Sequence, residues 1–188
     1  DQGAKWSPEW AERTIEIYEE LTRRAVAEGA AVVIWPETAA PGSLDSDPAL
    51  RGRITALAGD TGAFLVVGAV GIDGFDPAIG EPPRRADLKF FDSAYLVDAA
   101  GRSRGRYDKT HLVPFGEYLP FRPILGRFIR AIATGSAGQY VTAVKSPRGM
   151  VLPGLATGAG EPSVTVGVPI CYELLFPDLV RRFVGDGA

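Results

Sequence analysis

Two short runs of purely apolar residues constrain the fold of this chain most strongly. Residues 31–35 and 64–70 show no alternation between polar and apolar side chains, a pattern typical of β-strands that are covered on both faces. The segment between them has helix signals, because it begins at Asp47 and Pro48 and meets a natural stop at Gly62. The two runs therefore predict buried strands with a helix between them.

The other segments extend this pattern to an α/β fold. A first helix is predicted to begin at residues 7–9, with a capping hydroxyl and a proline in the first position, and to end at Gly29. Residues 90–97 and 103–107 are predicted to form a β-hairpin, and residues 163–168 a further strand. We expect helices to cover a largely buried sheet. The apolar residues that recur near helical spacing in the first helix are Trp10, Ile17, Leu21 and Ala25.

Composition and charge exclude several classes of protein. The 188 residues carry a formal net charge of −3 without a basic block, so nucleic acid is not expected as a partner. One cysteine excludes an internal disulfide and a cysteine-based zinc cluster, and one histidine, His111, excludes a histidine-rich metal site. No apolar run approaches the roughly 20 residues that span a bilayer. Residues 1–3 and 184–188 nevertheless look like cut ends, and we expect a fragment of a longer protein.

Cys171, the single cysteine, follows the predicted strand at 163–168 and precedes a helix that Pro177 is expected to open. At such a strand-to-helix junction backbone N–H groups converge, and the helix N-terminus lowers the pKa of a thiol. The position is that of a nucleophile. The alternative is a buried structural cysteine, the commoner role of a lone cysteine.

Glu37 and Lys109 also follow predicted strands, so three reactive side chains are expected at one edge of a sheet. Together they fit acyl transfer, in which the Cys171 thiolate attacks a carbonyl and forms a thioester. Glu37 would take the thiol proton, and Lys109 would stabilise the oxyanion. Taken singly, Glu37 would more often be an exposed loop acid and Lys109 a solvated hairpin charge.

The motifs around these residues resemble the nitrilase (carbon–nitrogen hydrolase) superfamily, and within it the apolipoprotein N-acyltransferase branch. The resemblance rests on residues 107–120, Tyr-Asp-Lys-Thr-His-Leu-Val-Pro-Phe-Gly-Glu-Tyr-Leu-Pro, and on residues 2–6, 35–38 and 171–173. It extends over nearly the whole chain. The run around Lys109 is highly specific, whereas the glutamate motif alone would be weak.

The resemblance implies a nitrilase-like α-β-β-α sandwich, with residues 1–188 forming one domain of a longer membrane enzyme, apparently truncated at both ends. It implies that a fatty acyl chain passes from a phospholipid to Cys171 and then to the N-terminal amine of a diacylglyceryl-lipoprotein. Glu37 would be the general base and Lys109 the stabiliser of the intermediate. The domain would face the outer, periplasmic side of the bacterial inner membrane. No metal or organic cofactor is implied.

Further residues match positions that this branch needs. Glu117 matches a second essential glutamate, and the intervening Pro114 and Gly116 would let a tight loop bring it back to Lys109. His111 is expected to be a structural hydrogen-bonding residue, and the alternative for Glu117 is a surface glutamate. Residues that match supporting or substrate-binding positions are Tyr172 and Glu173 beside the cysteine, and Trp6 near the acyl-chain path. The alternative for Tyr172 and Glu173 is packing and a local salt bridge, and for Trp6 it is cover of the first helix.

Two segments between Lys109 and Cys171 have no clear element pattern. Residues 121–132 mix apolar side chains with arginines and fit an amphipathic arm at the membrane surface, or a plain lid. Residues 134–160 are rich in Gly, Ala and Ser and are expected to be loose. Two other functions stay open: a soluble amidase of the same superfamily with water as acceptor, and a non-catalytic fragment.

Overall fold

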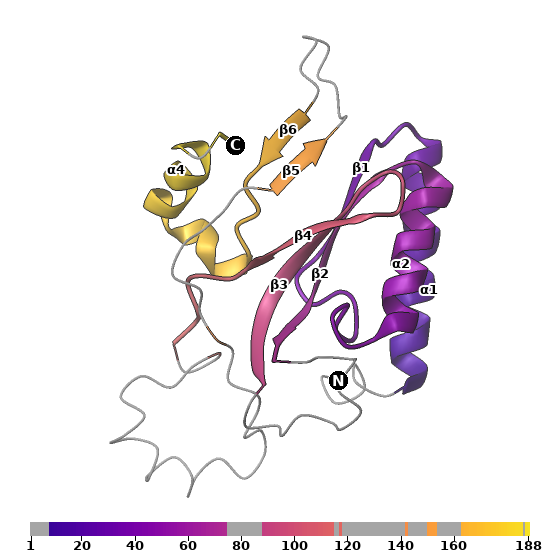
Figure 1. Ribbon diagram of the computed structural model, residues 1–188, viewed down its shortest axis with the longest axis horizontal. Coiled ribbons are helices and arrows are strands. Elements are labelled where there is room, and N and C mark those ends of the chain that lie inside the picture. The colour runs from indigo at the N-terminus through magenta and orange to yellow at the C-terminus, as the bar shows by residue number, and fades with distance from the viewer. Residues whose placement is uncertain are drawn as a thin grey trace, which may run out of the picture.

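A four-stranded sheet forms the centre of this computed structural model, with the strand order β1-β2-β3-β4 (Figure 1). β1 pairs with β2 in parallel, and the other neighbours pair antiparallel. The strands are β1 (Val32–Trp35), β2 (Phe64–Asp73), β3 (Lys89–Val97) and β4 (Ser103–Asp108). The structure describes residues 8–74, 88–114, 117, 142, 150–153, 163–185 and 187–188.

Helices α1 (Pro8–Ala27) and α2 (Pro48–Thr61) cover one face of this sheet (Figure 1). Asp47 caps α2, because its side chain accepts hydrogen bonds from two N–H groups of the first turn. Gly62 ends the helix in the left-handed conformation, at φ +67°. The core between helices and sheet includes Ile15, Trp35, Ile54, Leu57, Leu65, Val67, Tyr95 and Val97.

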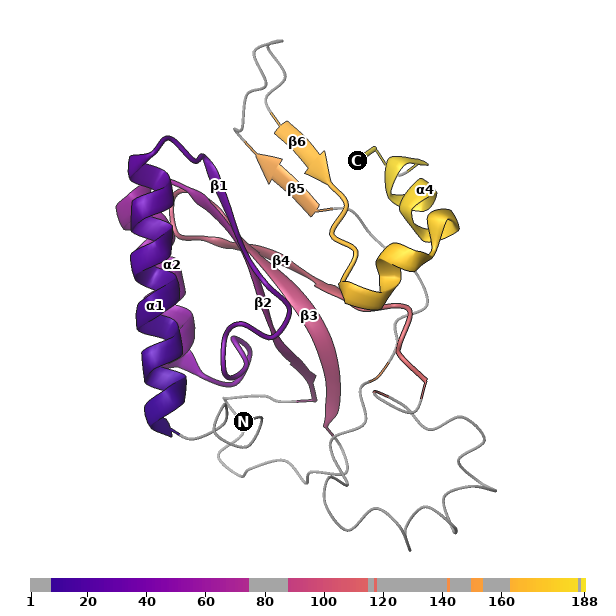
Figure 2. The ribbon, with the colours of Figure 1, turned by 180° about the vertical axis from the view of Figure 1, so that it is seen from behind.

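The opposite face of the sheet carries a second layer, seen from behind in Figure 2. It contains the antiparallel pair β5 (Met150–Pro153) and β6 (Ser163–Val166), the short 3₁₀ helix η2 (Cys171–Leu175) and α4 (Pro177–Gly185). The core between the layers includes Phe64, Val66, Ala94, Leu96, Tyr107, Met150, Ile170, Leu179 and Phe183. Helices, sheet and second layer together confirm the predicted α/β class.

Alternation of side chains along β3 and β4 decides which residues share a face. Ala94 and Tyr107 belong to the core under the second layer, whereas Tyr95 belongs to the core under the helices. Because side chains alternate between the two faces of a strand, Asp92 and Lys109 lie on the face of the second layer.

The predicted elements are largely confirmed, but two predictions of burial are wrong. In α1 the predicted apolar positions Trp10, Ile17 and Leu21 are exposed, and the sheet is instead contacted through the stripe that contains Ile15. In β1, for which the sequence predicts cover on both faces, the side chain of Ile34 is 67% exposed. The physical reason is its position in β1, the strand at one end of the strand order, where Val32 packs against the core of the second layer but Ile34 does not.

The segment between Lys109 and Cys171 contains a strand that the sequence does not predict. β5 lies within residues 134–160, for which the composition predicts a loose segment, and its four residues pair with β6. The proposed arm at 121–132 lies outside the described residues. Within the described part of the chain, no helix has both the length and the apolar character that crossing a membrane requires.

Candidate active site

Glu37 lies in the turn after β1. This turn passes so close to β2 that a Cβ atom on Gly68 would lie 2.1 Å from the Pro36 carbonyl oxygen, so only glycine fits there. Thr38 continues the turn at φ +48°, a left-handed conformation that is rare for a β-branched residue. The strained turn leaves the Glu37 side chain 32% exposed and 2.9 Å from the Lys109 ammonium.

Lys109 follows β4, and its side chain is fully buried. Its backbone N–H donates to the Asp92 carbonyl oxygen at 2.9 Å, which extends the pairing of β3 and β4. Its Nζ donates to Glu37 Oε1 at 2.9 Å, Asp92 Oδ2 at 3.1 Å and Glu117 Oε1 at 2.6 Å. Burial alone would lower the pKa of Lys109, but the hydrogen bonds to these carboxylates outweigh it and raise the pKa. The ammonium is therefore a fixed positive charge inside the site.

Two hydrogen bonds join Glu117 to Val113, four residues earlier in the chain. The Glu117 N–H donates to the Val113 carbonyl oxygen at 2.9 Å, and Glu117 Oε2 accepts from the Val113 N–H at 3.1 Å. This reciprocal pair fixes the position of Glu117, and it leaves Oε1 for the lysine. The structure thus places Glu117 beside Lys109.

Asp92 is a member of the cluster that sequence reasoning missed. Its side chain is only 7% exposed, and its Oδ1 has no hydrogen-bond partner among the described residues. Burial, reinforced by contact with Glu37, raises the pKa of Asp92 to about 8. The same contact, helped by Lys109, lowers the pKa of Glu37 to about 2 against the opposing effect of burial. The signal in the sequence was a lone acid inside a strand of otherwise apolar and small residues.

The carboxylates around Lys109 could be mistaken for a metal site. One oxygen each of Glu37, Asp92 and Glu117 lies within 4.8 Å of the others. The Lys109 nitrogen, however, is within hydrogen-bonding distance of all three oxygens and supplies the cation itself. We therefore assign no metal to this cluster.

Cys171 opens η2 as predicted for a junction between strand and helix, and its side chain is exposed. Its φ of +48° is unusual for a residue with a side chain. The expected lowering of its pKa is wrong: a hydrogen bond with Glu37, together with burial, raises the pKa of the thiol. The negative carboxylate favours the protonated thiol, and this outweighs the effect of Lys109. The resting form of Cys171 is therefore the protonated thiol.

Glu173 joins the cysteine segment to the lysine segment from a fully buried position. Its Oε1 accepts from the Thr110 N–H at 2.6 Å, the Thr110 hydroxyl at 2.7 Å and the His111 N–H at 3.1 Å. Its Oε2 accepts from the Ile170 N–H at 2.8 Å, and the Tyr107 hydroxyl lies 2.9 Å from both oxygens. One buried carboxylate thus sets the distance between the two segments.

The aromatic side chains beside the cysteine pack together. Phe176 contacts the rings of His111, at 4.5 Å between centroids, and Tyr172, at 5.1 Å. His111 Nδ1 lies 3.0 Å from the Thr110 hydroxyl. These contacts give His111 and Tyr172 defined positions at the rim of the site. Trp6 lies outside the described residues.

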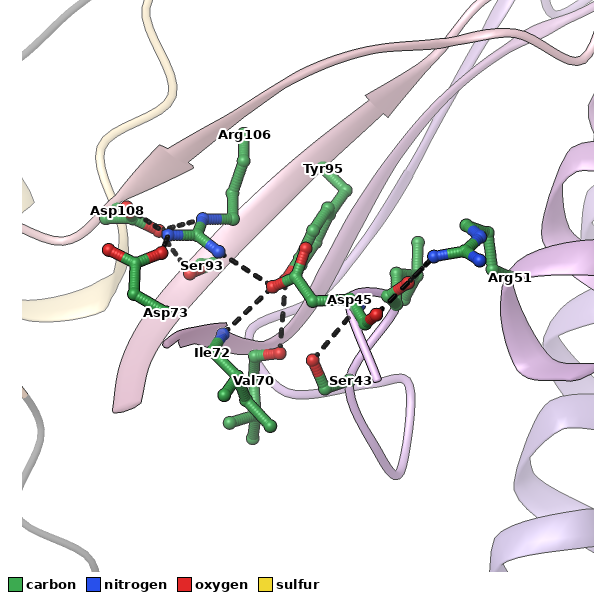
Figure 3. A network of polar contacts seen from close by, with 11 residues as sticks. Ser43, Asp45, Arg51, Val70, Ile72, Asp73, Ser93, Tyr95, Arg106 and Asp108 are labelled. Carbon is green, nitrogen blue, oxygen red and sulfur yellow. Dashed lines mark hydrogen bonds and ion pairs between the residues drawn. The ribbon is translucent and has the colours of Figure 1, made fainter. Parts of the chain in front are cut away.

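A second polar network supports the same strand ends from the helix side of the sheet (Figure 3). Arg106 donates to Asp45 Oδ2 and to Asp73 Oδ1, both at 2.7 Å, and pairs with Asp108. Asp45 also accepts from the Tyr95 hydroxyl at 2.6 Å. Asp45 lies on the chain that follows Glu37, and Asp108 directly precedes Lys109, so this network holds both segments of the site.

Comparison with known proteins adds sequence relatives to this geometry. The apolipoprotein N-acyltransferase of Geobacter metallireducens is 36% identical over 192 residues, which cover 100% of this chain and 32% of that protein. The apolipoprotein N-acyltransferase of Rhizobium meliloti is 35% identical over 184 residues, which cover 96% of this chain and 32% of that protein. The chain thus spans about a third of the length of these curated relatives.

Solved structures and a family match agree on the fold. An amidase from Nesterenkonia sp. superposes with a TM-score of 0.61 at 21% identity, over 95% of this chain and 56% of that one. At this identity the likeness shows a shared fold, and nitrilase-superfamily amidases have this fold. The carbon-nitrogen hydrolase family matches residues 3–188. This chain therefore belongs to the carbon–nitrogen hydrolase family.

Proposed function

We propose that this chain is the catalytic domain of an apolipoprotein N-acyltransferase. One observation carries the proposal: the Glu37 carboxylate contacts both the exposed Cys171 thiol and the buried Lys109 ammonium. Base, nucleophile and fixed positive charge are the components that acyl transfer through a thioester requires. The names of the relatives from Geobacter metallireducens and Rhizobium meliloti support this choice of acyl transfer.

In the first half-reaction the thiol proton of Cys171 passes to Glu37, and Sγ attacks the ester carbonyl carbon of a phospholipid. The tetrahedral oxyanion needs a positive partner, and all three N–H bonds of the Lys109 ammonium are engaged with carboxylates. Protonation of Glu37 weakens one of these bonds and releases a donor for the oxyanion. Collapse breaks the ester C–O bond, Glu37 returns its proton to the leaving alkoxide, and a thioester remains.

In the second half-reaction the N-terminal amine of a diacylglyceryl-lipoprotein attacks the thioester. Glu37 accepts the amine proton, the C–S bond breaks, and the proton returns to Cys171 as the amide is released. Glu37 therefore acts as base in both halves. Lys109 stabilises both tetrahedral intermediates by its charge.

The partners follow from this chemistry. The acyl donor is a phospholipid and the acceptor a lipoprotein anchored in the same membrane, so the domain works at a membrane surface. We place residues 1–188 as a single domain on the periplasmic side of the bacterial inner membrane. Residues 121–132, with apolar and arginine side chains, are assigned to this surface.

Three further residues complete the assignment. Glu117 orients Lys109 through its 2.6 Å hydrogen bond. Tyr172 lies next to the nucleophile and against Phe176, where its ring lines the approach of substrate. Trp6 is assigned to the path of the acyl chain.

The proposal is tested by mass spectrometry after incubation with a phospholipid in detergent. We expect an acyl adduct on Cys171 that hydroxylamine removes, and transfer of that acyl chain to a diacylglyceryl peptide. Cys171→Ala is the control. Cys171→Ser and Lys109→Ala should abolish thioester formation, and Glu117→Ala should impair turnover while the protein stays folded.

Other results would contradict the proposal. Hydrolysis of small amides without detergent, with no acyl adduct from phospholipid, would favour an amidase with water as acceptor. A folded protein without either activity would favour a non-catalytic fragment. A fully active Glu117→Ala variant would remove the role assigned to that residue.

A further inference from the structure

We propose that Asp92 is a positioning residue that keeps a proton in the resting site and donates it in a hydrogen bond to Glu37. The two carboxyl groups then hold one proton between them, and Asp92 acts on the reaction through Glu37. This inference rests on the proposed function only in taking Glu37 as the base.

The first argument is the balance of charge around Lys109. Three carboxyl oxygens lie within 4.8 Å of one another, and within the described residues Lys109 is the cation that contacts them. Full ionisation would leave two negative charges in excess in a largely buried space. Like charges at this separation strongly disfavour complete ionisation, so one carboxyl group keeps its proton.

The second argument identifies the group that holds the proton. Asp92 is 7% exposed, compared with 32% for Glu37 and 20% for Glu117, and burial disfavours its charged form most. Its Oδ1 is a buried acceptor without a donor among the described residues. The side chain in contact with Asp92 besides the lysine is another acceptor, Glu37. A proton between the two groups removes this mismatch.

Neighbouring side chains on this face of the sheet do not donate a hydrogen bond to Asp92 Oδ1 in the described part of the chain. Val70 of β2, opposite Asp92 in the sheet, is apolar. On β4 the next inward side chain is Tyr107, whose hydroxyl is directed to the buried carboxylate of Glu173. Among the described residues, the titratable groups around Asp92 are Lys109, Glu37 and Glu117, and Cys171 lies on the other side of Glu37 as its partner.

The proton on Asp92 makes the thiolate easier to form. When Cys171 transfers its proton to Glu37, the S–H bond breaks, an O–H bond forms and both carboxyl groups are neutral. After the transfer the thiolate and Glu117 are negatively charged and Lys109 is positively charged. The site therefore carries one negative charge in excess, the same as before the transfer. An ionised Asp92 would add a further negative charge beside the thiolate and raise its energy.

The matched test is Asp92→Asn, because an amide reproduces the shape and donor of a protonated carboxyl group but cannot ionise. We would measure the rate of alkylation of Cys171 by iodoacetamide across the pH range. At about pH 7 the variant should react within about threefold of the wild type. Above about pH 8, where the wild-type Asp92 ionises, the variant should become faster by on the order of tenfold. Asp60→Asn, which removes an exposed carboxylate of α2, should match the wild type throughout.

A second readout uses the wild type alone and covers the case in which the variant does not fold. Infrared spectroscopy should show the carbonyl stretch of a protonated carboxyl group at about pH 7, and the band should disappear as the pH passes above about 8. The absence of this band at neutral pH would overturn the proposal. So would an Asp92→Asn variant whose alkylation is accelerated equally at every pH, because Asp92 would then be ionised throughout. Neither readout requires a phospholipid, so failure of the acyltransferase assignment would be seen separately.

Discussion

Replacement of Glu173 by glutamine should loosen the connection between the cysteine and lysine segments. In the orientation that preserves most native contacts, the amide carbonyl takes the place of Oε1 and keeps the hydrogen bonds from Thr110 and His111. The NH₂ group then takes the place of Oε2 and faces the Ile170 N–H. Two donors cannot satisfy each other, so this buried N–H loses its acceptor.

The cost follows from the individual contacts. A buried N–H without an acceptor costs about 1–3 kcal/mol, and hydrogen bonds to a charged group contribute about 1.5–3 kcal/mol compared with about 1 kcal/mol for neutral ones. Because such terms do not add fully, we expect Glu173→Gln to lower the free energy of unfolding by about 3 kcal/mol. For a domain of this size that corresponds to roughly 6–12 °C in Tm.

The assay is urea denaturation followed by tryptophan fluorescence, since Trp35 is buried in the core under the helices. Tyr107→Phe is the matched control, because it removes one hydroxyl from Glu173 and keeps the ring against Phe183. It should cost about 1.5 kcal/mol, the low end for a hydrogen bond to a charged group, because Glu173 keeps its other donors. A Glu173→Gln variant that is destabilised no more than this control, with unchanged alkylation of Cys171, would refute the reasoning.

Two further predictions concern β2 and the pH dependence of stability. Gly68→Ala should lower the free energy of unfolding by about 1–3 kcal/mol or more, because its Cβ would meet the Pro36 carbonyl oxygen. Gly52→Ala should instead raise the free energy of unfolding by roughly 0.5–1 kcal/mol, because Gly52 lies in α2 and the added Cβ would have nothing within 4 Å. Equal urea midpoints for the two variants would contradict this. The pKa of Asp92 rises from 3.8 to about 8 on folding, so between these pH values the folded protein holds a proton that the unfolded chain has lost. The contribution of Asp92 to the free energy of unfolding therefore falls as the pH rises from about 4 to about 8. The stability of Asp92→Asn relative to the wild type should therefore increase over this window in thermal melts, and a constant difference would count against it.

The order of helices and strands was predictable because local signals agree with the final fold. Asp47 and Gly62 define α2 through capping, and Pro177 opens α4, as expected from their chemistry. β5 was missed because four residues in a Gly-rich segment provide too short a pattern to distinguish a strand from a loop. Its pairing with β6 is a tertiary contact that local sequence does not encode.

The orientation of α1 shows why burial was harder to predict than helix position. Leu21 is more apolar than Thr22, yet Thr22 is buried and its hydroxyl accepts a hydrogen bond from the Trp35 indole at 2.9 Å. A polar residue on the inner face hides the true stripe from a count of apolar positions. The partner that makes its burial favourable lies 13 residues away.

The candidate site was predictable only as a set of residue types at strand ends. Residues with strong motifs, such as Lys109 and Glu117, were expected near one another, and the structure places them 2.6 Å apart. Asp92 was missed because one acid in a strand has no motif. The direction of the pKa shift of Cys171 depends on how close Glu37 comes, a distance that spacing along the chain does not determine.

The long separations within the cluster have a consequence for how the protein folds. Lys109 contacts Glu37 from 72 residues away and Asp92 from 17, and Glu173 contacts Tyr107 from 66 residues away. Contacts of such high sequence separation form late, because the entropy of closing long loops must be overcome first. Until then Cys171 belongs to an unstructured segment and reacts as an ordinary thiol. The moment when its reactivity departs from that of a free cysteine therefore marks the end of folding, and a pulse of alkylating reagent during refolding would time it.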